Sequence, residues 1–122
     1  MERSSALNDG YRTLRDPVLR AEYLCKLEGI DVDSSDPKSG APQMGQGFLI
    51  EMIERREEVS EAKAAGAKAL DELRGRVEDE LEDTFDEAIE RLGADQTLEA
   101  AKALVKRRYL QRLVDEIDAL DP

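Results

Sequence analysis

The chain has 122 residues, and its 29 acidic against 18 basic side chains give a net charge of -11, which disfavours nucleic acids and anionic membrane surfaces as partners. Histidine is absent and Cys25 is the only cysteine, which excludes cysteine–histidine zinc sites, iron–sulfur clusters ligated by this chain alone, internal disulfides and imidazole-dependent catalytic triads. No stretch is apolar enough to span a membrane, and a single cysteine fits a reducing compartment, so we expect a cytoplasmic protein. Because histidine is absent and cysteine occurs once, we expect a protein that is not an enzyme and holds no metal or cofactor.

Residues 1–30 are predicted to form a helical segment that is interrupted near its middle. The residue before a proline avoids the helical conformation, so Asp16 and Pro17 end the first half. The same pair suits the start of a second helix, with Asp16 as the N-cap and Pro17 in the first turn. We expect this second helix to end at Gly29 in a left-handed cap, with Cys25 as an inert, packed side chain within it. The apolar residues on one face of the first half are Leu7, Tyr11 and Leu14.

Residues 31–46 are rich in turn-forming residues and show no periodicity, so they are predicted to form a linker loop. In residues 47–122, the spacing of apolar side chains predicts three amphipathic helices. The first runs over about residues 46–63, the second closes at Gly93, and the third begins with Thr97 as its N-cap. Short turns favour an antiparallel three-helix bundle, so the fold class is all-α. The predicted core positions are Phe48, Met52, Val59, Leu70, Leu73, Val77, Leu81, Phe85, Ala88, Leu92, Leu98, Ala101, Val105, Tyr109, Leu113, Ile117 and Leu120.

The second and third predicted helices carry opposite charges. Residues 71–90 contain ten carboxylates and two arginines, whereas residues 102–112 contain five basic side chains and no acidic one. We expect the two helices to lie side by side and to attract each other. The alternative is that the basic stripe binds an acidic partner. A nucleic-acid site is not expected there, because only Tyr109 could stack on a base.

The helix that begins near residue 47 carries apolar side chains on more than one face. At 100° per residue, Ile53 and Ile50 lie roughly 140° and 200° from Phe48, which faces the core. An aliphatic surface with a polar rim is typical of a protein-binding site. The alternative is that the helix is wedged between two neighbours and buries both faces. This outer strip consists of Leu49, Ile50 and Ile53, with the carboxylates of Glu54 and Glu57 beside it.

Several runs of the sequence resemble one known family. The run LNDGYRTLRDPVLRAEYL at residues 7–24 is similar to the end of a J-domain. Its continuation CKLEG at 25–29, with GFLIEMIERREEV at 47–59 and KRRYLQRL at 106–113, resembles the HscB family of J-type co-chaperones of iron–sulfur cluster assembly. The resemblance implies an L-shaped protein in two parts. An N-terminal J-domain would stimulate the ATPase of a DnaK-like chaperone (HscA), and a C-terminal three-helix bundle would bind the cluster scaffold IscU.

The resemblance also implies where the scaffold binds. In the family, aliphatic and glutamate side chains on the first bundle helix and an aromatic side chain on the last helix make the contact. Tyr109 stands where the family usually has phenylalanine, and we expect antiparallel packing of the first and last bundle helices to bring it beside the outer strip. The corresponding residues of this chain are Leu49, Ile50, Ile53, Glu54, Glu57 and Tyr109.

One feature of the family is missing from this sequence. J-domain function depends on a His-Pro-Asp loop, which a chain without histidine cannot contain, and only the last J-domain helix, roughly residues 4–27, is present. Either the chain is a shortened form, or it is a relative that has dropped chaperone stimulation. We therefore expect a binding module that docks the scaffold without activating an ATPase. The alternative is a structural helical module that self-associates through the outer strip.

Overall fold

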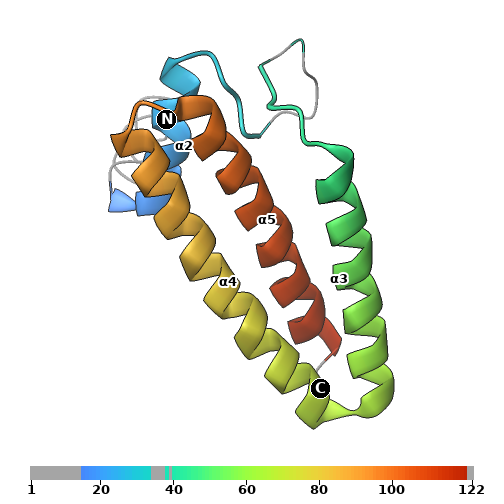
Figure 1. Cartoon of the computed structure of the whole chain (residues 1–122). Coiled ribbons are helices and arrows are strands. Elements are labelled where there is room, and N and C mark those ends of the chain that lie inside the picture. Colours follow the sequence, from blue (N-terminus) through green and yellow to red (C-terminus); the bar gives the residue numbers. More distant parts are fainter. Residues whose placement is uncertain (1–14, 34–37, 39, 121–122) are drawn as a thin grey trace, which may run out of the picture.

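Every regular element in the described part of the chain is an α-helix, which confirms the all-α fold class. Three long helices run side by side as a bundle, and a short helix packs near one end of it (Figure 1). The helices are α2 (Pro17–Leu27), α3 (Gln46–Ala65), α4 (Ala67–Gly93) and α5 (Thr97–Leu120). No helix among them is long and apolar enough to cross a bilayer. The computed structural model describes residues 15–33, 38 and 40–120, and the predicted stripe of Leu7, Tyr11 and Leu14 lies outside them.

Successive helices of the bundle are antiparallel, as predicted. α3 runs away from the linker loop, α4 returns, and α5 runs away again, so α3 and α5 are parallel to each other (Figure 1). The expected antiparallel packing of the first and last bundle helices is therefore wrong, because two reversals restore the original chain direction. In the parallel arrangement the first turn of α3 lies beside the middle of α5, where Phe48 contacts Tyr109.

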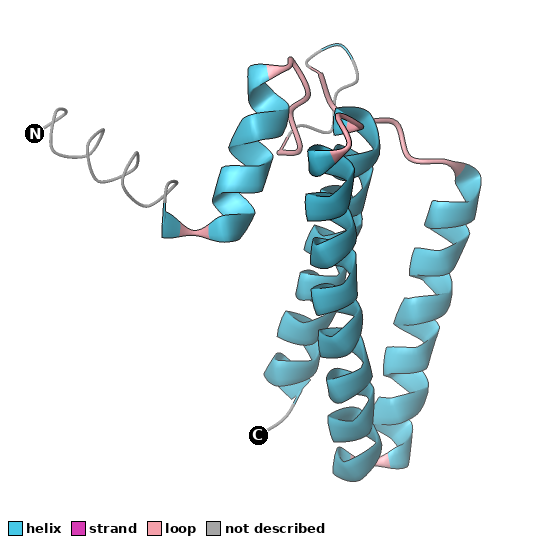
Figure 2. Cartoon of the chain, turned by 60° about the vertical axis from the view of Figure 1, so that its left-hand side comes forward, coloured by secondary structure: helices cyan, strands magenta, loops and turns pink. Residues whose placement is uncertain are grey.

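The short helix α2 lies on the opposite side of the α4–α5 pair from α3 (Figure 2). At its start, the side chain of Asp16 accepts a hydrogen bond from the backbone N–H of Val18 at 2.9 Å. At its end, Gly29 has a φ of 85°, and the N–H of Ile30 donates to the carbonyl of Cys25 at 3.1 Å. This is a Schellman-type cap. The N-cap and the left-handed glycine predicted for this helix are both confirmed.

The turns within the bundle are short. Gly66 alone separates α3 from α4, and its φ of 117° is a conformation that favours glycine. α4 ends at Gly93 as predicted, but the left-handed residue of its cap is Asp95, with a φ of 59°. The N–H of Gln96 donates to the carbonyl of Arg91 at 2.9 Å and closes this cap. The left-handed position falls two residues beyond the end of the helix, and aspartate tolerates that conformation.

The core consists of two clusters along the bundle. One lies between α3, α4 and α5 and is formed mainly by large aliphatic side chains such as Leu73, Leu110 and Ile117. The other lies beneath α2 and the linker loop and is rich in alanine. Because alanine side chains are small, α2 can approach α4 and α5 closely there. α2 covers only the alanine-rich cluster, and the bundle helices extend beyond it to form the other cluster.

The core prediction is more accurate for α4 than for α5. The buried α4 residues include five of the predicted stripe, whereas Phe85 and Leu92 are half-buried. On α5, Leu98 is 47% exposed although it was predicted to be in the core. α5 contacts α2, α3 and α4, so it buries more of its circumference than one stripe. The α5 residues that the single-stripe prediction missed are Ala100, Ala103, Leu104, Leu110 and Val114.

The basic stretch of α5 forms ion pairs with segments other than α4. Lys106 lies 3.4 Å from Glu51 of α3, and Arg108 pairs with Glu22 of α2 and Asp33 of the linker loop. α4 and α5 lie side by side as expected, but within the described residues no ion pair joins the acidic residues of α4 to this stretch. The two helices meet through apolar side chains, which leaves the basic side chains on the flanks that face α2 and α3.

Candidate functional site

The outer strip of α3 is exposed along its whole length. The side chains of Leu49, Ile50 and Ile53 are 53%, 56% and 59% exposed, although each is large and aliphatic. α3 directs Met52 and Val59 into the core instead. α2 lies on the far side of the bundle, so no described segment covers the strip. Among the described residues, α3 therefore does not bury both faces between two neighbours, contrary to that alternative.

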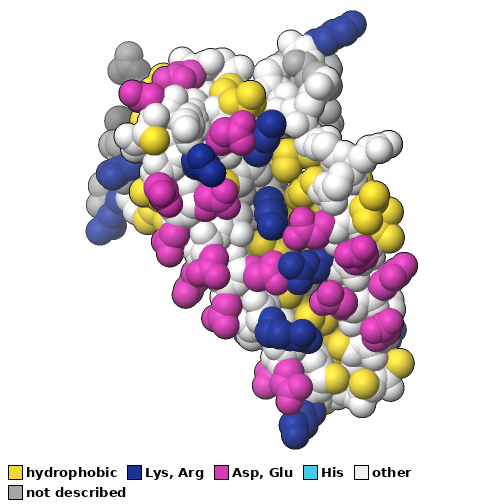
Figure 3. Space-filling view, in the orientation of Figure 1, with side chains coloured by type: hydrophobic (Ala, Val, Ile, Leu, Met, Phe, Trp, Pro, Cys, Tyr) yellow, Lys and Arg dark blue, Asp and Glu magenta, His cyan; other side chains and the backbone are white. Residues whose placement is uncertain are grey.

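Carboxylates border the outer strip. Glu54 and Glu57 are exposed, and neither forms an ion pair with another described residue. The inner flank of α3 differs, because Arg55 donates a hydrogen bond of 2.6 Å to Glu80 of α4. The space-filling view shows hydrophobic and acidic side chains gathered on the α3 side of the molecule (Figure 3). The negative charge beside the strip is available to a positively charged partner surface.

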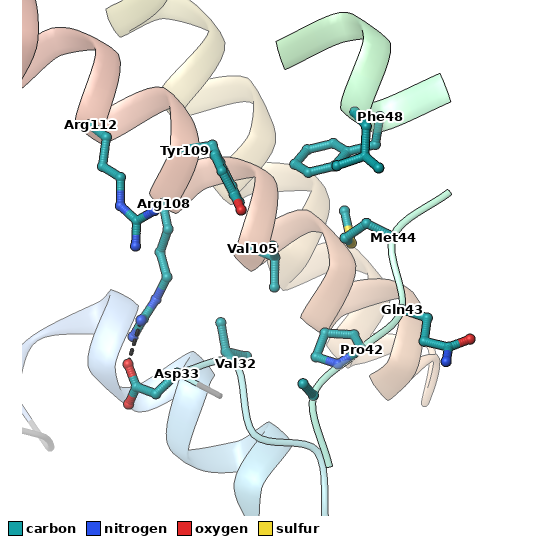
Figure 4. Close-up of a pocket in the computed structure, with 12 residues that line it drawn as sticks. Val32, Asp33, Pro42, Gln43, Met44, Phe48, Val105, Arg108, Tyr109 and Arg112 are labelled. Carbon is teal, nitrogen blue, oxygen red and sulfur yellow. Dashed lines mark ion pairs between the residues drawn. The ribbon is translucent and has the colours of Figure 1, made fainter. Parts of the chain in front are cut away.

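Tyr109 of α5 lies beside the first turn of α3. Its ring packs edge-on against Phe48, with the ring centroids 5.3 Å apart and the ring planes at 80°. The guanidinium carbon of Arg112 lies 5.2 Å from the centroid of the same ring. Arg112 belongs to the basic stretch at residues 102–112, and its spacing of three from Tyr109 places both on one helix face. Half-buried Tyr109 thus contacts Phe48 of α3 as well as Arg112, which is exposed on α5 (Figure 4).

Four of the six predicted site residues line two neighbouring hollows. Leu49 and Tyr109 line a cleft of about 540 Å³ between the linker loop, the first turn of α3 and α5. Ile53 and Glu57 line a shallow groove further along α3. The remaining two predicted residues line neither hollow and are exposed. Leu49 belongs to the outer strip and also lines the cleft that Tyr109 faces. It therefore connects the outer strip to the surface around Tyr109.

Arg108 forms part of the wall of this cleft and ties three segments together. Its guanidinium pairs with Asp33 of the linker loop (Figure 4) and with Glu22 of α2. Partial burial acts to lower the pKa of Arg108, but the hydrogen bonds and negative charges of the two carboxylates outweigh burial and raise the pKa. The side chain therefore stays cationic and holds α2 and the linker loop against α5.

Cys25 lies at the contact between α2 and the bundle and is completely buried. Burial raises the pKa of its thiol, and the nearby charges of Glu22 and Glu28 raise it further. Because the thiolate is the reactive form, these effects disfavour reaction of the thiol. The predicted packed position of Cys25 is confirmed. Among the residues that the structure describes, no group of three or more cysteine or acidic side chains is placed to hold a metal ion.

The bundle matches one known protein family. The family model described as the HSCB C-terminal oligomerisation domain matches residues 44–118. The matched range includes α3, α4 and almost all of α5. It therefore includes the outer strip, its carboxylate border and Tyr109.

Curated relatives extend the similarity to nearly the whole chain, and each of those cited is named co-chaperone protein HscB homolog. The relative from Neisseria meningitidis serogroup B is 35% identical over 117 residues, which cover 95% of this chain and 68% of the relative. The relative from Burkholderia vietnamiensis is 36% identical over 126 residues, with coverages of 98% and 66%. The relative from Aromatoleum aromaticum is 33% identical over 120 residues, with coverages of 97% and 66%. The chain thus spans about two thirds of the length of these relatives.

Proposed function

Because the chain belongs to the HscB co-chaperone family of iron–sulfur cluster assembly, we propose that its bundle docks an IscU-type scaffold protein through the outer strip. The observation that carries this proposal is the exposure of Leu49, Ile50 and Ile53 on consecutive turns of a helix. Burying such side chains against a partner removes a large apolar area from water, which is the dominant favourable term in protein association. The fold itself gains nothing from leaving them exposed.

The carboxylates of Glu54 and Glu57 and the ring of Tyr109 complete the proposed site. The carboxylates give the strip a polar rim that favours a basic surface on the scaffold and excludes an acidic one. Tyr109 adds an aromatic edge at the end of the strip where Leu49 lies. Aromatic side chains at the edge of an aliphatic patch are frequent in protein interfaces.

In the proposed role, the docked scaffold is presented to a DnaK/HscA-like chaperone. This chain contains no histidine, so it has no His-Pro-Asp loop through which to stimulate the ATPase of that chaperone. We expect steady-state ATP hydrolysis by a DnaK-like chaperone to be unchanged when the purified chain is added. Acceleration by the chain would contradict this part of the proposal.

The docking proposal is tested by replacing Leu49, Ile50 and Ile53 together with alanine and titrating the variant with an IscU-type scaffold in a calorimeter. Truncation of a well-buried interface side chain typically costs about 1–3 kcal/mol, so binding should be lost while the melting temperature hardly moves. A control variant removes three exposed aliphatic side chains away from the strip and should bind normally. The control substitutions are Leu27→Ala, Ile89→Ala and Leu98→Ala, at positions that are all exposed. Normal binding by the strip variant, or unfolding of it, would contradict the proposal.

Self-association through the outer strip is the second candidate function, because the matching family model is described as an oligomerisation domain. Sedimentation separates the two candidates. Docking of a scaffold predicts a monomeric chain over a wide concentration range. Self-association predicts a dimer that forms with increasing concentration and that the strip variant abolishes.

A further inference from the structure

The cleft beside the outer strip is open and is lined by both apolar and polar side chains. Pro42 and Met44 of the linker loop and Phe48 of α3 form one wall, and Val105 and Tyr109 of α5 form the floor (Figure 4). Its volume of about 540 Å³ is sufficient for one or two protein side chains. Leu49 belongs both to this cleft and to the outer strip, so a protein that covers the strip also reaches the mouth of the cleft.

Two arginines of α5 line this cleft together with Asp33 and Gln43, but the arginines differ in their partners. Arg108 is neutralised by Glu22 and Asp33. Arg112 is exposed, its guanidinium carbon lies 5.2 Å from the ring centroid of Tyr109, and no carboxylate of the described residues pairs with it. Arg112 therefore contributes a positive charge to the cleft lining that no described carboxylate balances.

The chemistry of Arg112 favours an added carboxylate. Glu22 and Asp33 already neutralise Arg108, so Arg112 is the arginine of the cleft that is open to a carboxylate of a partner. The planar guanidinium of Arg112 offers a fork of N–H donors that matches a carboxylate. A large polyanion is disfavoured by the net charge of -11.

We propose that the cleft receives an aspartate or glutamate side chain of the scaffold protein, which pairs with Arg112. The inference rests on the proposed function, because it takes the scaffold to be the protein that covers the outer strip. It gives the docking surface two electrostatic ends. The carboxylates of Glu54 and Glu57 meet basic residues of the scaffold, and Arg112 meets an acidic one, so the scaffold binds in one orientation only.

The first test compares Arg112→Gln with Lys68→Gln by calorimetric titration with an IscU-type scaffold. Both variants remove one positive charge, but exposed Lys68 lies at the start of α4, at the other end of the bundle. We expect Arg112→Gln to weaken binding about tenfold to a hundredfold, as for loss of a hydrogen bond between charged groups, and Lys68→Gln to change the Kd by less than about twofold. Equal Kd values for the two variants would overturn the inference.

The second test identifies the paired carboxylate by charge exchange. Each aspartate and glutamate of the scaffold is replaced in turn by lysine and titrated with Arg112→Glu, whose circular dichroism is first matched to that of the unaltered chain. One lysine variant should restore the affinity that Arg112→Glu loses, whereas the same variant should bind the unaltered chain more weakly. Absence of any rescuing position would overturn the inference. Absence of scaffold binding by the unaltered chain would instead overturn the proposed function, and the inference with it.

Discussion

α3 and α4 are neighbouring helices that both carry more acidic than basic side chains, but they use their apolar side chains differently. In α4 the large aliphatic residues lie almost entirely on one stripe, which α5 and α3 cover. In α3 the buried residues are Met52, Val59 and Ala62, while three larger aliphatic side chains of the outer strip face solvent. The sequence of α4 is therefore explained by the fold alone. The sequence of α3 is explained only by the fold together with a second contact.

The first prediction tests this comparison with the same substitution on both helices. Leu81→Ala in α4 removes a buried side chain and should lower the free energy of unfolding by about 2–5 kcal/mol. Leu49→Ala in α3 removes an exposed one and should change it by less than about 0.5 kcal/mol. Urea unfolding of the two variants measures both values. A large loss for Leu49→Ala would show that the outer strip supports the fold.

The second prediction tests how strongly the ion pairs of Arg108 hold α2 against the bundle. Arg108→Ala leaves the carboxylate of Glu22, which is only 13% exposed, without its partner. The free energy of unfolding should fall by about 1–3 kcal/mol. The buried Cys25 should also react faster with a thiol reagent, because α2 opens more often. The matched control is Arg56→Ala, which breaks an exposed pair with Glu116 at 3.1 Å and should cost less than about 1 kcal/mol. Equal costs, or an unchanged thiol reaction, would contradict the role given to Arg108.

The sequence was most informative where one residue type decides a local conformation. Asp16 before Pro17 can start a helix but not continue one, and Gly29 suits the left-handed cap. The stripe of α4 was also predictable, since α4 buries a single face. These signals are local, so they do not depend on how the helices are arranged in space.

The features that the sequence did not predict depend on that arrangement. The parallel direction of α3 and α5 follows from counting reversals rather than from any residue. The ion pairs of Lys106 and Arg108 depend on which flank of α5 faces each neighbour. The cleft beside Tyr109 depends on the path of the linker loop, whose turn-forming residues predict a loop but not its course. The outer strip could be identified from the sequence, because its helix carries more apolar side chains than one face can hold.

The third prediction concerns Gly75, which is exposed in the interior of α4. A Cβ at this position would meet no neighbouring atom within 4 Å, so Gly75→Ala adds helix propensity without a steric cost. We expect the free energy of unfolding to rise by up to about 1 kcal/mol. Scaffold affinity should not change, because α4 takes no part in the proposed docking surface. A fall in the free energy of unfolding would show that the helix is distorted at this point.

The last prediction separates the carboxylates of α3 from those of α4. Glu54 and Glu57 border the outer strip, whereas Glu82 and Asp83 lie on the exposed face of α4. Neutralising either pair as the amides removes the same charge from the chain, so a difference between the pairs reports their position. Association of the scaffold should slow about twofold to fivefold for the α3 pair, because charges at the rim of an interface act mainly on the association rate. The α4 pair should have little effect.

Salt provides the decisive comparison in stopped-flow measurements of this association. At about 0.5 M salt the Debye length is only a few ångströms, so exposed charges no longer steer the scaffold and the α3 variant should associate as fast as the unaltered chain. The aliphatic contacts of the outer strip do not depend on salt in this way, so the dissociation rate should remain nearly the same for both. A defect in the α3 variant that persists at high salt would mean that Glu54 or Glu57 makes a desolvated contact with the scaffold rather than steering it. An equal slowing by the α4 pair would mean that only the net charge of the chain matters, and the distinction drawn between the two helices would then not extend to their acidic residues.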